Sequence, residues 1–329
     1  MTEGTQTSLR VDGAAAAQTF RCSLVIPTKN GGELFRRVIK ALQQQTCWKD
    51  VEFIIVDSQS NDDTVEISRA AGAKCLTVAA GEFDHGATRD FAISWATANR
   101  VVLMVQDAIP HDPHMIENLI AALDEDGVAG VYARQIPQAD ADVITKRNLN
   151  IHLTGRLCRD TQRISNAAAF AALPPMERYI LCNFDNVCSA LRKDVWQEER
   201  FGRISFGEDI DWSERVLKRG YKIVYEPAAA VVHSHDRPLS YEYKRNYICH
   251  HKLFSQFGIQ VTPTVRTVVR GWYLLTKSDM LYVAQTEHRF GEKIALLLKT
   301  PVLNFLRILG QFRAVRDAKS GVLRSMSGV

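Results

Sequence analysis

The sequence predicts an α/β fold built on a doubly wound, mainly parallel sheet, followed by a helical C-terminal extension. Short apolar runs typical of buried strands alternate with helical patterns through the first 110 residues. The segments between these runs are long enough for one helix each, as parallel strands require. From about Ser240 onward the pattern is helical and basic, which predicts the extension.

Each expected element has a local signal. The run CSLVIPT (22–28) is continuous and apolar, and 31–45 repeats Leu34, Val38 and Leu42 at helical spacing. A second strand is expected at 51–58, followed by a helix that ends at Gly72. The pattern continues with strands at 73–78 and 100–108 on either side of a helix at 86–98.

The second half is less regular. A helix is expected at 113–123 and a strand at 128–136, whereas 140–180 shows few clear elements, as is typical of ligand-binding loops. Segments 186–196, 207–220 and 221–235 predict a strand–helix–strand continuation. We expect a disordered leader at 1–20, an α/β region with halves at 21–110 and 111–240, and a basic helical extension at 241–329.

The composition indicates a soluble protein. Hydrophobic residues make up 46% and charged residues 24% of the 329 positions, and the seven cysteines are scattered without a C-x-x-C pair. We find no signal peptide. The apolar stretch 294–312 is interrupted by Lys299, Pro301 and Arg307, so it falls short of the ~20 apolar residues of a membrane span. A reduced, cytoplasmic protein is expected.

The charge is unevenly distributed. From Ser240 to the end there are 14 Lys and Arg against 5 Asp and Glu, whereas the rest of the chain has 27 against 32. A basic tail suggests an anionic partner, and no nucleic-acid motif is found there. Trp272 and Tyr273 lie among the charges, which favours peripheral contact with the inner face of the plasma membrane or with a lipid-phosphate acceptor. A basic solvated face on a helical cap fits equally well.

Polar residues follow three of the expected strands. Open α/β sheets bind ligands at the carboxyl ends of their strands. The residues expected at this edge are Pro27, Thr28, Lys29, Asn30, Asp57, Ser58, Gln106 and Asp107. Asp57 could accept the imide N–H of a uracil or thymine ring, or could simply form its turn. Nearby, GEFDHGATRD holds His85 and Arg89, and arginine offers a planar fork for a diphosphate.

A metal site is expected at the same edge. Mg²⁺ or Mn²⁺ bound to a diphosphate needs only one or two protein ligands, and Asp107 supplies a carboxylate. His233 and His235 end a strand-like run and point the same way, and imidazole would suit Mn²⁺ better than Mg²⁺. Taken alone, these histidines fit hydrogen-bonded edge residues better.

An acidic cluster opens the helix that Gly207 and Gly220 delimit. On a helical wheel Asp209 falls within the apolar arc and Glu208 at its margin, whereas Asp211 falls on the opposite arc. An inward carboxylate in the first turn, kept ionised by the helix dipole, suits a general base. An N-terminal capping role is the alternative, and the pattern alone favours it.

Together these motifs resemble glycosyltransferase family 2, with its GT-A fold, from about Ser23 to His235. VIPTKN, IIVDSQSNDDT, ATRDFA, VQDA and GEDIDW occur in the family's order. FDHGATRD, VQDAIP and FDNVCSALRKDVW resemble the rhamnosyltransferase branch. Two departures stand out: Val105-Gln106-Asp107 keeps only the later carboxylate of the D-x-D region, and Arg89-Asp90 replaces the usual Arg-Asn.

The resemblance implies an inverting, metal-dependent transfer. The implied donor is dTDP-L-rhamnose, and the acceptor is a saccharide or lipid-linked saccharide of surface polysaccharide synthesis. Residues 21–110 would be the nucleotide-sugar-binding half and 111–240 the acceptor-binding and catalytic half of one domain. Asp209, in the E-D motif with Glu208, would be the base. The alternatives are a UDP-hexose donor and a non-catalytic polysaccharide-binding or nucleotide-sugar-binding protein. A dehydrogenase would need G-x-G-x-x-G after the first strand, and PTKNGG does not match.

Overall fold

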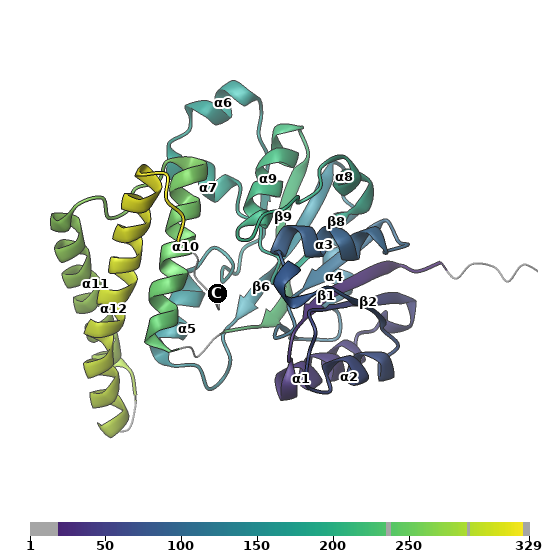
Figure 1. Ribbon diagram of the computed structural model, residues 1–329, viewed down its shortest axis with the longest axis horizontal. Helices are drawn as coiled ribbons and strands as arrows, with labels where there is room; N and C mark the ends of the chain where they lie inside the picture. Colours follow the sequence, from purple (N-terminus) through teal and green to yellow (C-terminus); the bar gives the residue numbers. More distant parts are fainter. Residues whose placement is uncertain (1–18, 235–237, 288–289, 325–329) are drawn as a thin grey trace, which may run out of the picture.

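The structure, a computed structural model, describes residues 19–234, 238–287 and 290–324. Nearly all of the expected leader at 1–20 therefore lies outside the described residues, and so does His235. The predicted α/β fold with a helical C-terminal extension is confirmed. A bundle of three helices, α10 Leu239–Phe257, α11 Val265–Gln285 and α12 Phe290–Lys319, lies beside a central sheet (Figure 1).

One nine-stranded sheet forms the centre of the molecule, in the order β3-β2-β1-β4-β8-β6-β9-β5, with β7 also paired to β9. The first four strands along the chain are parallel, so their carboxyl ends meet at one edge. β8 runs antiparallel to both β4 and β6, which makes the sheet mixed. The strands are β1 Cys22–Thr28, β2 Val51–Asp57, β3 Lys74–Thr77, β4 Arg100–Met104, β5 Ile109–Pro110, β6 Val128–Ile136, β7 Asp160–Gln162, β8 Cys188–Arg192 and β9 Lys222–Val232.

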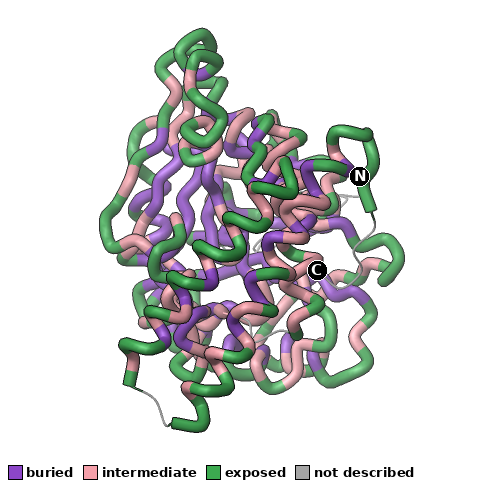
Figure 2. Tube along the Cα trace, turned by 90° about the vertical axis from the view of Figure 1, so that its left-hand side faces the viewer, coloured by how far each residue is buried: buried purple, intermediate pink, exposed green. Residues whose placement is uncertain are grey.

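Helices cover both faces of the sheet. Successive side chains of a strand point to opposite faces, so both faces carry apolar side chains that the helices bury. Leu24 and Ile26 pack with Phe35 and Leu119 on one face, and Val25 packs in the core of the other. Figure 2 shows the buried positions concentrated in the strands. The helices of this region are α1 Gly32–Leu42, α2 Thr64–Ala70, α3 His85–Ser94, α4 Met115–Leu123, α8 Lys193–Glu198 and α9 Glu208–Lys218.

The segment 140–180 contains more regular structure than its sequence predicts. It holds α5 Val143–Ile151, β7, α6 Ala167–Ala172 and α7 Pro175–Leu181. The helices are short, and two of them have six or seven residues, so hydrophobic periodicity has few turns in which to repeat. Asp142 and Asn166 nevertheless cap α5 and α6 by accepting hydrogen bonds from Thr145 N and Ala169 N.

The C-terminal extension consists of α10 Leu239–Phe257, α11 Val265–Gln285 and α12 Phe290–Lys319. The helix α12 runs through Pro301 without a break. Among the described residues, α12 is the one helix long and apolar enough to cross a membrane by length and composition, a condition that core helices of soluble proteins also meet. Thr300, Asn304 and Asp317 are buried along it.

Candidate active site

The carboxyl ends of β1, β2 and β4 form one connected edge. Gln106 binds the backbone after β1 at two points: its Oε1 accepts from Lys29 N at 2.8 Å and its Nε2 donates to Lys29 O at 3.0 Å. Asn30, with φ at +47°, donates its N–H to Ser60 Oγ, and its Oδ1 accepts from Asn61 N. The loops after three strands are thus fixed to one another.

A pocket of about 450 Å³ opens on this edge, and we call it the donor pocket. Its lining includes several of the predicted residues and two aromatic rings, those of Phe83 and His85, which meet edge to face with their centroids 5.0 Å apart. Ser58 Oγ is buried and has no hydrogen-bond partner among the described residues, so a ligand could supply one. The lining residues are Pro27, Thr28, Lys29, Ser58, Ala80, Phe83, His85, Arg89, Val105 and Gln106.

Asp57 lies at the turn after β2 and is buried. Its Oδ1 accepts from Thr28 Oγ1 at 3.0 Å and from Ser60 Oγ at 2.6 Å, and its Oδ2 accepts from Ser60 N at 2.8 Å. These contacts match the turn-forming alternative that the sequence left open.

Arg89 and Glu208 form a buried ion pair that joins α3 to α9. Arg89 Nη1 donates to Glu208 Oε1 at 2.7 Å, and both side chains are almost fully buried. Burial on its own raises the pKa of Glu208, but the charge of Arg89 and a hydrogen bond from Asn186 outweigh it and hold that pKa below the usual value. Burial, and then the charge of Arg89, lower the pKa of His85, so this imidazole is neutral near pH 7.

A second cavity, of about 380 Å³, continues from the donor pocket and shares His85, Arg89 and Val105 with it. We call it the catalytic cavity. Glu208 and Asp209 line it from α9, Asp107 from the segment after β4, Asp185 from the segment before β8, and Arg245 from α10. Carboxylates from distant parts of the chain are thereby brought to one space.

The burial of the acidic pair is the reverse of the prediction. Glu208 is 4% exposed, whereas Asp209 is half-buried and faces the catalytic cavity. Asp209 Oδ1 accepts from Ile210 N at 2.8 Å, and its Oδ2 accepts from Asn186 N at 3.3 Å. Burial, followed by the charges of Glu208 and Asp185, raises the pKa of Asp209 well above its usual value, which also contradicts the expected dipole-stabilised ion.

Asp107 and His233 lie together, with His233 Nε2 3.7 Å from Asp107 Oδ1. The imidazole is held from behind, because its Nδ1 meets Gln135 Oε1 at 3.1 Å. Gln135 Nε2 donates to Asp185 Oδ2 at 2.7 Å, which fixes the amide with its oxygen towards the histidine. An amide oxygen only accepts, so Nδ1 carries a proton, and in the neutral imidazole the Nε2 lone pair would point towards Asp107.

This donor set fits a divalent ion carried by a diphosphate. Within the parts of the chain that the structure describes, no group of three or more His, Cys, Asp or Glu could hold a metal alone. One carboxylate and one oriented imidazole are nevertheless enough for Mg²⁺ or Mn²⁺ when phosphate oxygens complete the shell.

The family model for glycosyl transferase family 2 matches residues 23–198, which hold the donor-pocket edge and Asp107. The chain belongs to glycosyl transferase family 2. As a member of this family it is a glycosyltransferase, and its α/β sheet is of the GT-A type.

Curated relatives of this glycosyltransferase are named for rhamnosyl transfer. It is 28% identical to the O-antigen chain rhamnosyltransferase RfbN of Salmonella typhimurium over 69% of this chain and 70% of the relative. It is 30% identical to the O-antigen chain rhamnosyltransferase WbaN of Salmonella anatum over 68% of this chain and 70% of the relative. Each alignment covers more than two thirds of this chain and of the relative.

Solved structures show the same fold at low identity. A mannosyltransferase of Pyrobaculum calidifontis, in complex with GDP-mannose and Mn²⁺, matches with a TM-score of 0.57 and 15% identity over 90% of this chain and 86% of its own. Glucosyl-3-phosphoglycerate synthase of Mycobacterium tuberculosis, with Mg²⁺ and UDP, matches with a TM-score of 0.51 and 20% identity over 72% and 79%.

The structure accounts for one of the two departures from the family pattern. Asp90 points away from the donor pocket and accepts hydrogen bonds from Trp196 Nε1 at 2.7 Å, Phe201 N at 3.0 Å and Gly202 N at 2.8 Å. Its charge therefore fixes the segment before α9 and does not face the expected diphosphate.

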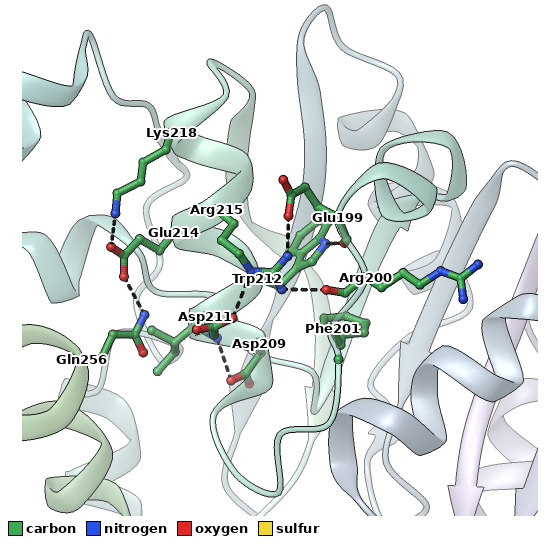
Figure 3. A network of polar contacts seen from close by, with 12 residues as sticks. Glu199, Arg200, Phe201, Asp209, Asp211, Trp212, Glu214, Arg215, Lys218 and Gln256 are labelled. Atoms are coloured by element: carbon green, nitrogen blue, oxygen red, sulfur yellow. Dashed lines mark hydrogen bonds and ion pairs between the residues drawn. The ribbon is translucent and has the colours of Figure 1, made fainter.

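The helix α9 is fixed by a polar network (Figure 3). Arg215 donates to Asp211 at 3.0 Å, to Glu199 and to Arg200 O, while Trp212 Nε1 donates to Glu199 O at 2.7 Å. Asp211 is thus a partner of Arg215 outside the catalytic cavity, as the helical wheel predicted. The network holds the helix whose first turn carries Glu208 and Asp209.

Several residues of the site were not assigned a role from sequence. Phe83 lines the donor pocket, and Asp185, Asn186 and Arg245 line the catalytic cavity. The quoted motif FDNVCSALRKDVW contains Asp185 and Asn186, so its polar residues before an apolar strand were the available signal. Arg245 lies in a helix whose cavity-facing side has no distinctive pattern.

Proposed function

We propose that this glycosyltransferase transfers L-rhamnose from dTDP-L-rhamnose, with inversion, to a saccharide or lipid-linked saccharide in surface polysaccharide synthesis. Two relatives named as O-antigen chain rhamnosyltransferases support the sugar and the process. A β-linked donor would then give an α-rhamnoside. The proposed place of work is the cytoplasm, at the inner face of the plasma membrane.

The observation that carries this proposal is the junction of two cavities. The donor pocket meets the catalytic cavity at His85, Arg89 and Val105, and the catalytic cavity holds Asp107 and Asp209. A nucleotide-sugar in the first would direct its reacting end towards the carboxylates of the second. Transfer between two bound substrates needs this arrangement.

Asp107 and His233 are the proposed metal ligands. Mg²⁺ or Mn²⁺, when bound, would neutralise charge that develops on the leaving diphosphate. Relatives of the same fold are described with these ions. Gln135 and Asp185 keep His233 in the orientation and tautomer that binding requires.

Asp209 is the proposed general base. Its carboxylate would take the proton of the acceptor hydroxyl, whose oxygen then attacks the anomeric carbon opposite the leaving diphosphate. A raised pKa suits this role, because proton transfer is most effective when the base titrates near the working pH. Arg89 and Asn186 hold Glu208, and Asn186 N also donates to Asp209, so the base has a fixed position.

The acceptor would enter from the side of α5 and α10. A polar chamber of about 190 Å³ adjoins the catalytic cavity there and shares Asp185, His233 and Arg245 with it. Asn148 and Glu242 add hydrogen-bonding groups to its wall. Such a wall suits the hydroxyl groups of a saccharide.

A donor screen tests the proposal. Purified protein with Mg²⁺ or Mn²⁺ is mixed with dTDP-rhamnose or with a series of UDP-hexoses, and release of the nucleotide diphosphate is measured with and without a saccharide acceptor. We expect release from dTDP-rhamnose, and its loss with EDTA. Release from a UDP-sugar alone would overturn the rhamnosyl assignment while keeping the enzyme class.

Two matched variants test the base. Asp209→Asn is expected to lower kcat for transfer by about a hundredfold to ten-thousandfold, the usual contribution of a general base, with donor affinity unchanged. Asp211→Asn removes a carboxylate two residues away that faces Arg215, and should transfer normally. Normal turnover by Asp209→Asn would show that another group takes the proton.

A further inference from the structure

An apolar stripe runs along the first half of α12. Phe290, Ile294, Leu298 and Val302 recur at every fourth position, and Phe305 follows three residues later. Residues spaced in this way share one face of a helix. They are exposed to 80%, 42%, 72%, 50% and 44%, so this face is not covered by the described residues.

A second stripe lies on α11, formed by Val265, Val269, Trp272 and Tyr273, all exposed. The two stripes meet at Trp272. Its ring packs edge to face with that of Phe305, with the ring centroids 6.5 Å apart, and its Nε1 donates to Pro301 O at 2.9 Å. Both helices lie at the outer side of the bundle, away from the sheet (Figure 1). We call the joined surface the hairpin face.

Basic residues border the hairpin face. Arg266, Arg270 and Lys277 are exposed on α11, at helical positions next to the apolar stripe. None of the three forms an ion pair within the described ranges 19–234, 238–287 and 290–324. Apolar side chains surrounded by unpaired cations complement a surface that is apolar below and anionic above.

The opposite side of α12 is committed to the protein. Asn304 Nδ2 donates to Asp279 of α11 at 2.9 Å, and Asp317 accepts from the Tyr247 hydroxyl of α10 at 3.2 Å. If α12 crossed a membrane, these buried polar contacts would be broken. The polar groups would then lie in lipid without hydrogen-bond partners, which is strongly unfavourable. The helix is therefore suited to lie on a bilayer and not to cross it.

We propose that the hairpin face docks on the surface of an anionic phospholipid bilayer, with its apolar stripes in the interfacial region and its basic residues at the headgroups. The proposal goes beyond the transfer reaction and does not depend on which donor is used. Docking would hold the enzyme at a bilayer that can carry a lipid-linked acceptor.

Flotation with phosphatidylcholine vesicles, with and without phosphatidylglycerol, tests the proposal on the full chain. We expect the protein to float with the anionic vesicles and to be released by high salt. The triple variant Arg266→Gln, Arg270→Gln, Lys277→Gln should partition about a hundredfold more weakly, since each basic residue near such a surface contributes about fivefold. The control Arg37→Gln, Lys40→Gln, Lys49→Gln removes three exposed cations elsewhere and should float like the wild type.

The apolar stripe is tested separately. Val269→Ser with Leu298→Ser should weaken flotation, whereas Leu157→Ser with Phe91→Ser, exposed at other places, should not. Transfer to a soluble saccharide should be unchanged in all four variants, so a failure of the proposed reaction is distinguishable from a failure of docking. Equal flotation with neutral and anionic vesicles, or self-association through this face in sedimentation without vesicle binding, would overturn the proposal.

Discussion

Asp209 titrates in a cavity with other carboxylates. Burial and the charges of Glu208 and Asp185 raise its pKa, so some of the protein carries a protonated Asp209 as the pH falls towards that value. A protonated carboxyl cannot accept the acceptor's proton. We therefore expect the rate of transfer to fall as the pH is lowered through the raised pKa of Asp209 and to recover above it.

Removing the charge of Glu208 tests this dependence. In Glu208→Gln the pKa of Asp209 loses an upward contribution, so the acid limb of the kcat/KM profile should move to lower pH. The variant leaves Arg89 without its buried partner, so its thermal midpoint should also fall. kcat/KM is measured at pH values where circular dichroism shows the variant folded.

Asp211→Asn serves as the control, since Asp211 binds Arg215 outside the cavity. Its acid limb should coincide with that of the wild type. A limb that stays in place or moves to higher pH in Glu208→Gln would contradict the assignment of the limb to Asp209.

At the scale of single residues, the sequence predicts which residues lie close together better than it predicts how their side chains are oriented. The carboxyl-end rule correctly places Thr28, Ser58 and Gln106 at one pocket. The helical wheel places Asp209 deepest, but Glu208 is deeper because Arg89, 119 residues earlier, draws it into an ion pair. A local pattern contains no information about a partner so far along the chain.

The helices α10 and α12 approach each other closely at Gly310. A Cβ built on Gly310 would lie 2.6 Å from the carbonyl oxygen of Tyr243, a backbone atom that cannot move aside alone. Gly310→Ala should therefore separate the two helices and lower the free energy of unfolding by about 1–3 kcal/mol, the usual cost of overpacking. Urea denaturation followed by circular dichroism measures the change.

Gly291, on the same helix, provides the matched control. A Cβ there would meet no atom of the described residues within 4 Å, so Gly291→Ala should be neutral or should stabilise the protein by up to about 1 kcal/mol through helix propensity. If Gly310→Ala were as stable as Gly291→Ala, the described packing of α10 on α12 would be wrong.

The elements that the sequence predicts best are those with a long or continuous pattern. The expected strand at 22–28 agrees with β1 residue for residue, and that at 128–136 with β6. The short helices α6 and α7 are missed because one or two turns show no period. Their positions depend on tertiary contacts, such as the burial of Phe170.

At the scale of the whole molecule, the extension contacts the α/β region through α5. Arg147 Nη1 donates to Asp279 Oδ1 at 2.7 Å, and Asn304 Nδ2 donates to Asp279 Oδ2 at 2.9 Å. Beside them, α5 residues 143 and 144 form a small core with Val283 and Leu303. Because buried polar and apolar contacts both cross this boundary, we propose that residues 241–329 unfold together with the α/β region.

Arg147→Met tests this cooperativity. Methionine keeps much of the apolar volume but leaves the Asp279 side chain, 2% exposed, with Asn304 as its remaining hydrogen-bond partner among the described residues. An uncompensated buried charge costs about 3 kcal/mol or more, reduced here because Arg147 itself is 26% exposed. Differential scanning calorimetry should show one transition shifted to lower temperature as a whole.

Arg36→Met, which removes an exposed pair with Asp63, is the control. It should lower the free energy of unfolding by less than about 1 kcal/mol. Two transitions of which only one moves would show instead that the extension is an independently folding unit, joined to the α/β region by a contact that contributes little to either.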